Sequence, residues 1–146
     1  MISGQGEEGM LITRETDYAL RILRTLSAGG HFTAGELAER EILPQKFAYK
    51  ILKKLEKAGF VNIVRGTRGG CSLGCDLRKV TLYELLEAMD MHSRLSACME
   101  SGYQCEWRGN GEQDCTIHCQ LSKVQEVLDS QLRSRSLYWM LYGEDD

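Results

Sequence analysis

Residues 43–74 read LPQKFAYKILKKLEKAGFVNIVRGTRGGCSLG, a helical pattern that runs directly into a hairpin pattern. The apolar residues that share one helical face are Phe47, Ala48, Ile51, Leu52 and Leu55. Pro44 suits the first turn of this helix, and Gly59 ends it. The β-rich run 60–65, the glycine-rich turn 66–70 and the short run 71–74 predict two antiparallel strands. The stretch therefore joins a lysine-rich helix to a basic hairpin.

Two further helices are predicted upstream of this stretch. Apolar spacing favours a helix over residues 13–28. Thr33 and Glu36 have the spacing of a capping box and open a second, short helix. Three helices followed by a basic hairpin are the order of a winged helix-turn-helix domain, which we assign to residues 10–80. Residues 1–9 are glycine-rich and acidic, and we expect a disordered extension there.

The rest of the chain is predicted to hold a connecting helix over 81–91, a cysteine-rich loop over 92–117, and a long helix with a tail over 118–146. The long helix is expected to run to Leu137. Its apolar stripe comprises Leu121, Val124, Leu128 and Leu132. An isolated apolar stripe is costly in water, so we expect it to form the contact of a homodimer. The predicted fold class is mainly α with a small β-hairpin wing: a winged helix-turn-helix domain plus a long C-terminal dimerisation helix.

Charge is divided unevenly along the chain. Residues 10–80 carry 13 Lys and Arg against 7 Asp and Glu, whereas the remainder carries 5 against 14. A polyanion would therefore meet the N-terminal half, and the expected partner is double-stranded DNA. No apolar run is long enough to span a membrane, and the N-terminus lacks the pattern of a signal peptide, so we expect a cytoplasmic protein.

The residues expected to contact DNA lie on the third helix and in the hairpin turn. They are Gln45, Lys46, Tyr49, Lys50, Lys53, Arg65, Thr67 and Arg68. Lysines contact mostly phosphates, while the residues near the start of the helix are better placed to reach base edges. A two-fold dimer would read a near-palindromic operator.

Four cysteines and a histidine cluster between the winged domain and the long helix: Cys98, Cys105, Cys115, His118 and Cys119. Cytosolic thiols are kept reduced, which favours metal binding over a disulfide framework. Thiolates bind iron–sulfur clusters and zinc alike, but the long gap between Cys105 and Cys115 lacks the tight spacing typical of zinc. The residues alone therefore predict a metal or iron–sulfur site, at which the spacing makes zinc the weaker alternative.

Several motifs together resemble the Rrf2 family of bacterial winged-helix regulators. They are MLITRETDYALR at 10–21, LPQKF at 43–47, KIL at 50–52, AGFV at 58–61 and RGTRGG at 65–70. The resemblance runs from Met10 almost to the C-terminus. It implies a transcription regulator, expected to act as a repressor, that senses nitric oxide, redox state or iron through a cluster in the cysteine loop.

The same resemblance implies the cluster ligands. Cys98, Cys105 and Cys115 match the three loop cysteines of the cluster-bearing members. The fourth ligand stays open: His118 stands at the offset used by the iron–sulfur biogenesis regulator, and Asp17 stands in the first-helix segment used by the nitric-oxide sensor. A [4Fe-4S] cluster is favoured over [2Fe-2S]. Two departures are the longer spacings of the loop cysteines and the thiol at residue 71, where many relatives carry an aromatic residue.

Two alternatives remain open. One is a cluster-free winged-helix regulator that responds to a metabolite or partner protein, and the other is a zinc or thiol-redox protein. Cys71 and Cys75 are expected to be structural or incidental. No nucleophile elbow, phosphate loop or zinc-protease motif occurs, so we do not expect an enzyme.

Overall fold

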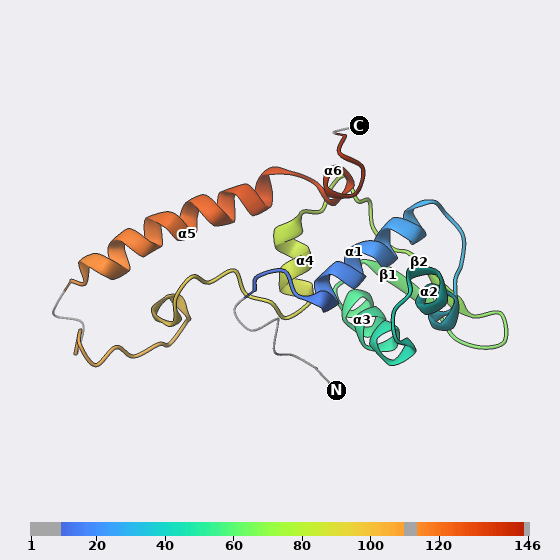
Figure 1. Cartoon of the computed structure of the whole chain (residues 1–146), viewed down its shortest axis with the longest axis horizontal. Coiled ribbons are helices and arrows are strands. Elements are labelled where there is room, and N and C mark those ends of the chain that lie inside the picture. Colours follow the sequence, from blue (N-terminus) through green and yellow to red (C-terminus); the bar gives the residue numbers. More distant parts are fainter. Residues whose placement is uncertain (1–9, 110–113, 145–146) are drawn as a thin grey trace.

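The computed structural model describes residues 10–109 and 114–144 and divides them into a helical domain with a hairpin and a long projecting helix (Figure 1). The elements in chain order are α1 (Arg14–Ser27), α2 (Ala34–Glu41), α3 (Gln45–Lys57), β1 (Val61–Val64), β2 (Gly70–Leu73), α4 (Leu82–Ala88), the 3-10 turn η1 (Ala97–Met99), α5 (Thr116–Ser134) and α6 (Leu137–Tyr142). Residues 1–9, expected to be a disordered extension, lie outside the described ranges. The order of elements confirms the predicted winged helix-turn-helix fold.

Threonine side chains begin three of the helices. The Thr33 hydroxyl accepts a hydrogen bond from the Glu36 amide at 3.1 Å and starts α2, and Thr81 with Glu84 forms a complete capping box at α4. Both follow the predicted spacing. Pro44 differs by one position from the prediction, because its extended backbone (ψ 136°) makes it the N-cap of α3 instead of a first-turn residue.

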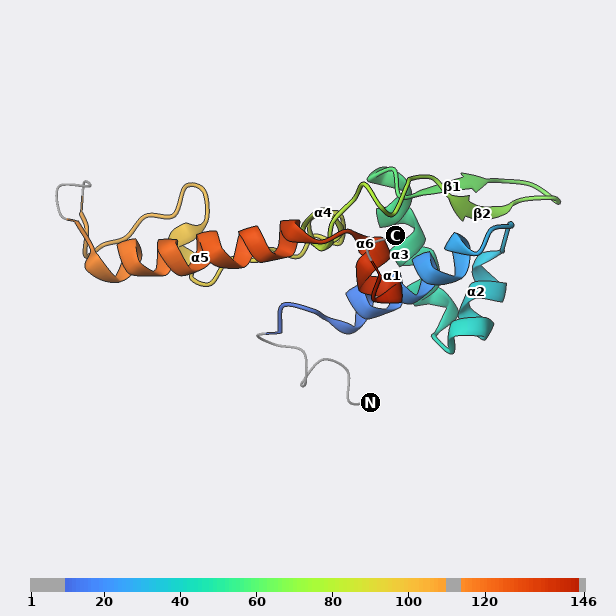
Figure 2. The same ribbon diagram turned by 90° about the horizontal axis from the view of Figure 1, so that it is seen from above.

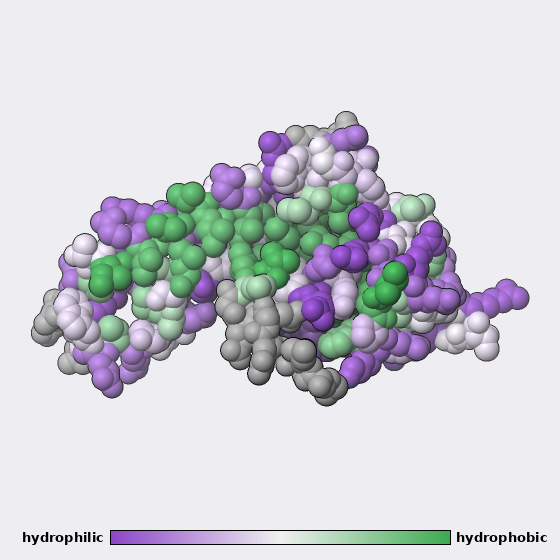
Figure 3. Space-filling view, viewed as in Figure 1, coloured by the Kyte–Doolittle hydropathy of each residue, from purple (hydrophilic) through white to green (hydrophobic). Residues whose placement is uncertain are grey.

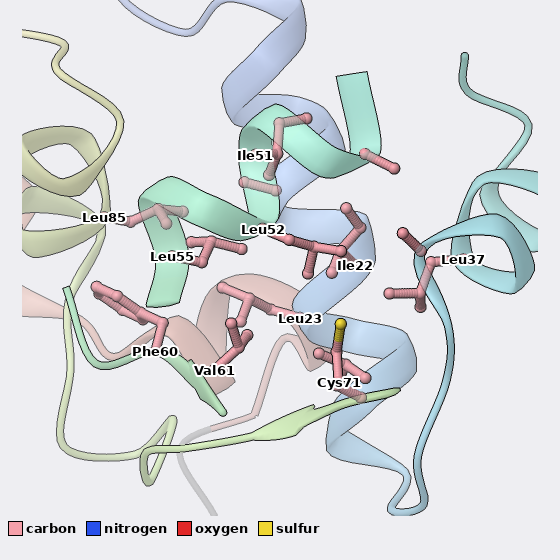
Figure 4. Close-up of a cluster of buried hydrophobic side chains, with 14 of the residues drawn as sticks. Ile22, Leu23, Leu37, Ile51, Leu52, Leu55, Phe60, Val61, Cys71 and Leu85 are labelled. Carbon is pink, nitrogen blue, oxygen red and sulfur yellow. The ribbon is translucent and has the colours of Figure 1, made fainter. Parts of the chain in front are cut away.

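The core of the winged domain lies where α1, α3 and the hairpin meet (Figure 4). Ile22, Leu23 and Leu55 are fully buried there, and Val61 and Cys71 reach the same core from the two strands. The strands are antiparallel, with Val61 opposite Leu73 and Val64 opposite Gly70. Burial of this apolar surface fixes the tilt of α3 relative to the hairpin.

The turn between β1 and β2 depends on a glycine. A Cβ atom at Gly69 would lie 2.3 Å from the carbonyl oxygen of Val64. No real Cβ approaches a backbone oxygen so closely, so only glycine fits at this position. The tight turn projects Arg65, Thr67 and Arg68 into solvent beyond the strands.

The helix α5 projects from the winged domain along the long axis of the molecule (Figures 1 and 2). It begins at Thr116, two residues before the predicted start, because Cys115 acts as its N-cap. The cysteine-rich segment lies beside it and contains η1. Within the ranges that the structure describes, no helix combines the length and the hydropathy that crossing a membrane requires.

The predicted helix over residues 118–137 is wrong at its C-terminal end. The chain turns extended at Arg135 (φ −128°, ψ 146°), and Ser136 caps a separate helix, α6. This short helix returns to the winged domain, where the amide of Leu137 donates to the Val80 carbonyl at 2.8 Å and the amide of Tyr138 donates to the Leu77 carbonyl at 3.0 Å. The final segment is therefore a docked element instead of a tail.

Replacing Leu137 with alanine is expected to destabilise the protein by about 2–5 kcal/mol, because the side chain is completely buried and its removal leaves a cavity. Urea unfolding followed by circular dichroism, at one fixed protein concentration, measures the change. Met140 on the same helix is 40% exposed, so Met140→Ala serves as the matched control. Equal stability of the two variants would show that α6 does not dock as described.

Candidate functional site

The exposed face of α3 carries the residues expected to contact DNA. Ala48, Ile51, Leu52 and Leu55 hold the helix on the core. The opposite side presents Gln45, Lys46, Tyr49, Lys50 and Lys53 to solvent, and Tyr49 is 55% exposed. The amphipathic pattern therefore leaves a cationic face with one large aromatic ring unpacked.

A groove of about 490 Å³ separates α3 from the hairpin. Tyr49 and Lys53 line it from the helix, and Arg65 lines it from the end of β1. The structure thus brings one flank of the helix and the predicted wing together around a single concave surface. Thr67 and Arg68 lie exposed in the turn beyond it.

An ion-pair network joins α3 to α1 and to the end of α4. The Lys50 ammonium lies 2.8 Å from Glu15 Oε1, and Lys54 lies 3.4 Å from Glu15 Oε2 and 3.5 Å from Asp90 Oδ2. Burial alone would raise the pKa of Glu15, but the hydrogen bond and charge of Lys50 and the charge of Lys54 outweigh it and lower the pKa. The hydrogen bond and charge of Glu15 in turn raise the pKa of Lys50. Sequence reasoning missed this network.

At the start of α5, His118 contacts two candidate ligand residues, Cys98 and Cys115. His118 Nδ1 lies 3.2 Å from Cys98 Sγ, and the amide of His118 donates to Cys115 Sγ at 3.4 Å. The thiol of Cys115 is therefore held at the N-terminus of α5. We call Cys98, Cys115 and His118 the helix-start group.

The other candidate ligands are not assembled with this group. Cys105 is half-buried in the same loop, while Asp17 lies on α1 and pairs with Arg21 at 3.1 Å. Figures 1 and 2 place α1 in the winged domain and the start of α5 at the far end of the molecule. Among residues 10–109 and 114–144, no three His, Cys, Asp or Glu side chains are placed to hold a metal ion.

The beginning of the cysteine loop is fastened to α5 by a buried glutamine. Gln125 Oε1 accepts from the Leu95 amide at 2.7 Å, and its Nε2 donates to the Ser93 carbonyl at 2.6 Å and to Asp129 at 2.8 Å. Burying an amide requires such partners. The loop therefore has two fixed ends, one at Gln125 and one at Cys115. The spacing of Gln125 and Asp129 on one helical face is the sequence signal that could have revealed this contact.

The remaining thiols have different environments. All six cysteines are free. Cys71 belongs to the core, and burial, with a smaller contribution from Glu56, raises the pKa of its thiol. Burial also raises the pKa of Cys75, assisted by Asp76 and Glu84. Cys119 is exposed. Cys71 is thus a packing residue, as the sequence indicated.

Alkylation of metal-free protein is expected to modify Cys119 first and Cys71 last. Alkylating reagents attack the thiolate, and Cys71 is both 3% exposed and raised in pKa. Iodoacetamide labelling over time, followed by peptide mass spectrometry, gives the rate at each site. Unfolded protein is the control, because all thiols are accessible in it. Labelling of Cys71 as fast as Cys119 would contradict its placement in the core.

An apolar band runs along α5 (Figure 3). Ile117, Val124 and Val127 are 71%, 55% and 62% exposed, and the predicted stripe residues Leu121, Leu128 and Leu132 are half-buried. Only Gln125 is buried on this helix within the described chain. The stripe is thus left open for another apolar surface.

These features define a winged-helix protein with a cationic α3 face and a thiol-bearing projecting helix. Residues 12–143 match the Rrf2 family, described as iron-dependent transcriptional regulators. The chain belongs to the Rrf2 family, as the sequence motifs indicated. Members of this family are transcription regulators and not enzymes.

Related sequences match the chain over part of its length. Over 64% of the length of this chain, it is 32% identical to protein aau3 of Rhizobium meliloti. Over 63% of its length, it is 27% identical to the HTH-type transcriptional regulator NsrR of Bacillus subtilis. The matched part spans 62% of aau3 and 65% of NsrR, less than two thirds of each relative.

Solved structures share the fold. T. potens IscR superposes with a TM-score of 0.65 at 20% identity, covering 94% of this chain and 90% of that one. CymR, the global cysteine regulator of B. subtilis, also gives 0.65, at 17% identity, covering 91% of this chain and 97% of that one. At these identities the likeness establishes the architecture alone.

Proposed function

We propose that this chain is a cytosolic transcription repressor that binds duplex DNA and whose affinity is controlled by an iron–sulfur cluster in the cysteine loop. The observation that carries the proposal is the helix-start group: a thiol and an imidazole already in contact, with a second thiol capping the same helix turn. Cys105 supplies the third thiolate from the same loop. The cationic face of α3 in the same chain would bind the DNA.

The DNA side rests on the α3 face and the wing. Gln45, Lys46 and Tyr49 occupy the first turns of α3, from which side chains can reach base edges in a major groove. Lys53 and Arg65 face the groove beside the wing, and Arg68 extends past it. We assign these basic residues, with Lys50 and Thr67, to phosphate contacts that fix the register of α3 on the duplex.

The donor set fits an iron–sulfur cluster in kind. Three thiols and one nitrogen or oxygen ligand are a known type of ligation, and all the thiols are free. Because the two ends of the loop are fastened by Gln125 and Cys115, only the segment between them has to close. Closing a loop of that length costs little more than closing a shorter one. When bound, the cluster would supply a redox-active centre that reacts with nitric oxide or oxidants; we favour [4Fe-4S] over [2Fe-2S].

His118 and Asp17 differ as fourth ligands. His118 already contacts Cys98, so it needs no large movement. Asp17 stands on α1 of the winged domain, away from the start of α5 in both views (Figures 1 and 2), so its carboxylate would reach the loop from a second chain. Ligation by Asp17 would link one protomer's cluster to its partner's α1 directly.

A homodimer follows from the apolar band on α5. We assign Leu121, Val124, Leu128 and Leu132 to the contact, with Val127 beside them. A second copy offers the same stripe, and two-fold pairing of identical stripes is the commonest solution for such a helix. Two winged domains then face two half-sites of a near-palindromic operator.

Movement at the cysteine loop can reach the winged domain through α5. The Arg133 guanidinium lies 3.8 Å from the centroid of the Tyr83 ring on α4, and α6 hydrogen-bonds to the chain before α4. Ordering of the loop would therefore bias the placement of α5 against α4, which in turn packs on α3. Such control requires that the loaded and empty forms differ in DNA affinity by a free energy of their own.

Fluorescence anisotropy tests sequence-specific DNA binding. It compares a duplex from the promoter of the gene that encodes this chain with a shuffled duplex of equal length. The proposal expects tighter binding to the promoter and a steep loss of affinity with salt, since basic residues release counterions. Equal binding to both duplexes, or no binding, would favour a zinc or thiol-redox protein.

A cluster-free regulator is the second candidate. The observation that favours it is that the described residues hold no preassembled group of three ligands. Such a regulator would keep its signal response after removal of the loop thiols, whereas the cluster-controlled regulator would lose it.

A further inference from the structure

The proposed phosphate-contacting residue Lys50 is not free. Its ammonium lies 2.8 Å from Glu15 Oε1, and the carboxylate is shared with Lys54 at 3.4 Å. The Glu15 side chain is 24% exposed, against 57% for Lys50. A half-buried carboxylate on α1 therefore holds an exposed lysine of α3.

Lys50 lies on a different flank of α3 from the residues that line the groove. Tyr49 and Lys53 are one helical turn apart and line the groove beside the wing. Lys50 belongs to the adjacent row, on the flank that packs toward α1. The face proposed to meet DNA thus has two flanks, one open beside the wing and one restrained by Glu15.

Restraint of a lysine has a predictable consequence for DNA binding. A lysine that contacts a phosphate releases a counterion whatever the base sequence, so free lysines strengthen binding to unrelated DNA. If the ion pair with Glu15 must be broken before Lys50 can reach a phosphate, Lys50 does not strengthen binding. It does so only when close docking on the DNA supplies enough free energy to break the pair. Such close docking occurs only on DNA sequences whose bases fit the side chains of α3.

Resting on the proposed DNA-binding function, we propose that Glu15 is a specificity-determining residue: it holds Lys50 back from phosphates in loose, non-specific complexes and so lowers affinity for unrelated DNA. Lys54 anchors the carboxylate from the other side and is itself tied to the Met89 carbonyl at 3.5 Å and to Asp90. Glu15 is thereby fixed in place instead of following Lys50 onto the duplex.

Glu15→Gln keeps the shape of the side chain and removes its charge. We expect several-fold tighter binding to unrelated duplex and a log–log salt slope that is steeper by about one unit for each chain engaged. Affinity for the promoter should rise less, so the ratio of promoter to unrelated affinity falls. Glu87→Gln is the matched control, because Glu87 is exposed on α4 and makes the same charge change without a lysine contact. Iron content is measured in each variant, since Asp17 lies two residues from Glu15.

A second pair of variants keeps the test decisive if Glu15→Gln folds poorly. Lys50→Gln should leave affinity for unrelated DNA close to that of the wild type, because Lys50 is already restrained, whereas Lys53→Gln should weaken it and reduce the salt slope. Equal losses for the two variants would overturn the role of Glu15. A wild-type protein that binds no duplex would instead overturn the proposed function, and this inference with it.

Discussion

Replacing Cys98, Cys105 and Cys115 together with serine is expected to abolish iron and sulfide binding and to lock DNA affinity at the value of the cluster-free protein. Serine keeps the size of the side chain but is not a soft thiolate ligand, so the cluster loses three of its proposed attachments. The variant should fold, because these residues are only half-buried and lie outside the core.

The measurement is iron and acid-labile sulfide content together with promoter affinity, before and after exposure to nitric oxide. Wild-type affinity should change by about 5-fold to 150-fold, the usual range of coupling between two sites, and the triple variant should not respond. Cys75→Ser is the control, because Cys75 lies in the winged domain. A triple variant whose promoter affinity responds to nitric oxide as the wild type's does would favour the cluster-free regulator over the cluster-controlled one.

Reversing two charges beside the α3 groove is expected to give the second large effect. Lys53→Glu combined with Arg65→Glu places carboxylates on both sides of that surface. In a dimer four cationic contacts become repulsive, so promoter affinity should fall by about a hundred-fold or more at moderate salt. The salt slope should also become shallower.

The matched control for this reversal is Lys79→Glu combined with Lys123→Glu. Both lysines are exposed, and neither lines the groove. The control has the same net charge, so it separates a local contact from a general electrostatic effect. If both double variants lose affinity equally, α3 and the wing do not form the specific surface that we propose. Anisotropy over a series of salt concentrations measures both quantities.

The winged domain could be predicted because its local signals agree with its packing. Thr33 caps α2 at the predicted position, and the apolar face of α3 is the buried one. A segment's fold can be predicted from sequence when its capping residues, its apolar periodicity and its burial all indicate the same structure. The Pro44 difference is small because an N-cap and a first-turn position are neighbours.

The break before α6 could not be predicted in the same way. Residues 134–137 contain neither Gly nor Pro, and an unbroken apolar run follows at 137–142, so no turn residue marks the break. The chain breaks because Leu137 gains a completely buried place in the core and backbone hydrogen bonds to the segment before α4. Tertiary contacts of this kind override local propensity.

The candidate site was predictable by residue type but not by arrangement. Thiols and an imidazole in a polar loop indicate ligands, yet the contact of His118 with Cys98 spans 20 positions and depends on how the loop folds back on α5. The buried Gln125 and the pairing of Glu15 with Lys50 depend in the same way on tertiary structure. Polar residues in an amphipathic pattern look alike until their partners are placed.

Anaerobic purification followed by paired measurements on one sample tests the central claim most directly. Iron, sulfide and zinc per chain are determined, and promoter affinity is measured before and after the cluster is removed with a chelator. The account predicts iron and sulfide in equal amounts, near four of each per chain for a [4Fe-4S] cluster, and a change in affinity when they are removed. Zinc without sulfide, or an affinity that stays the same after the iron is removed, would contradict it.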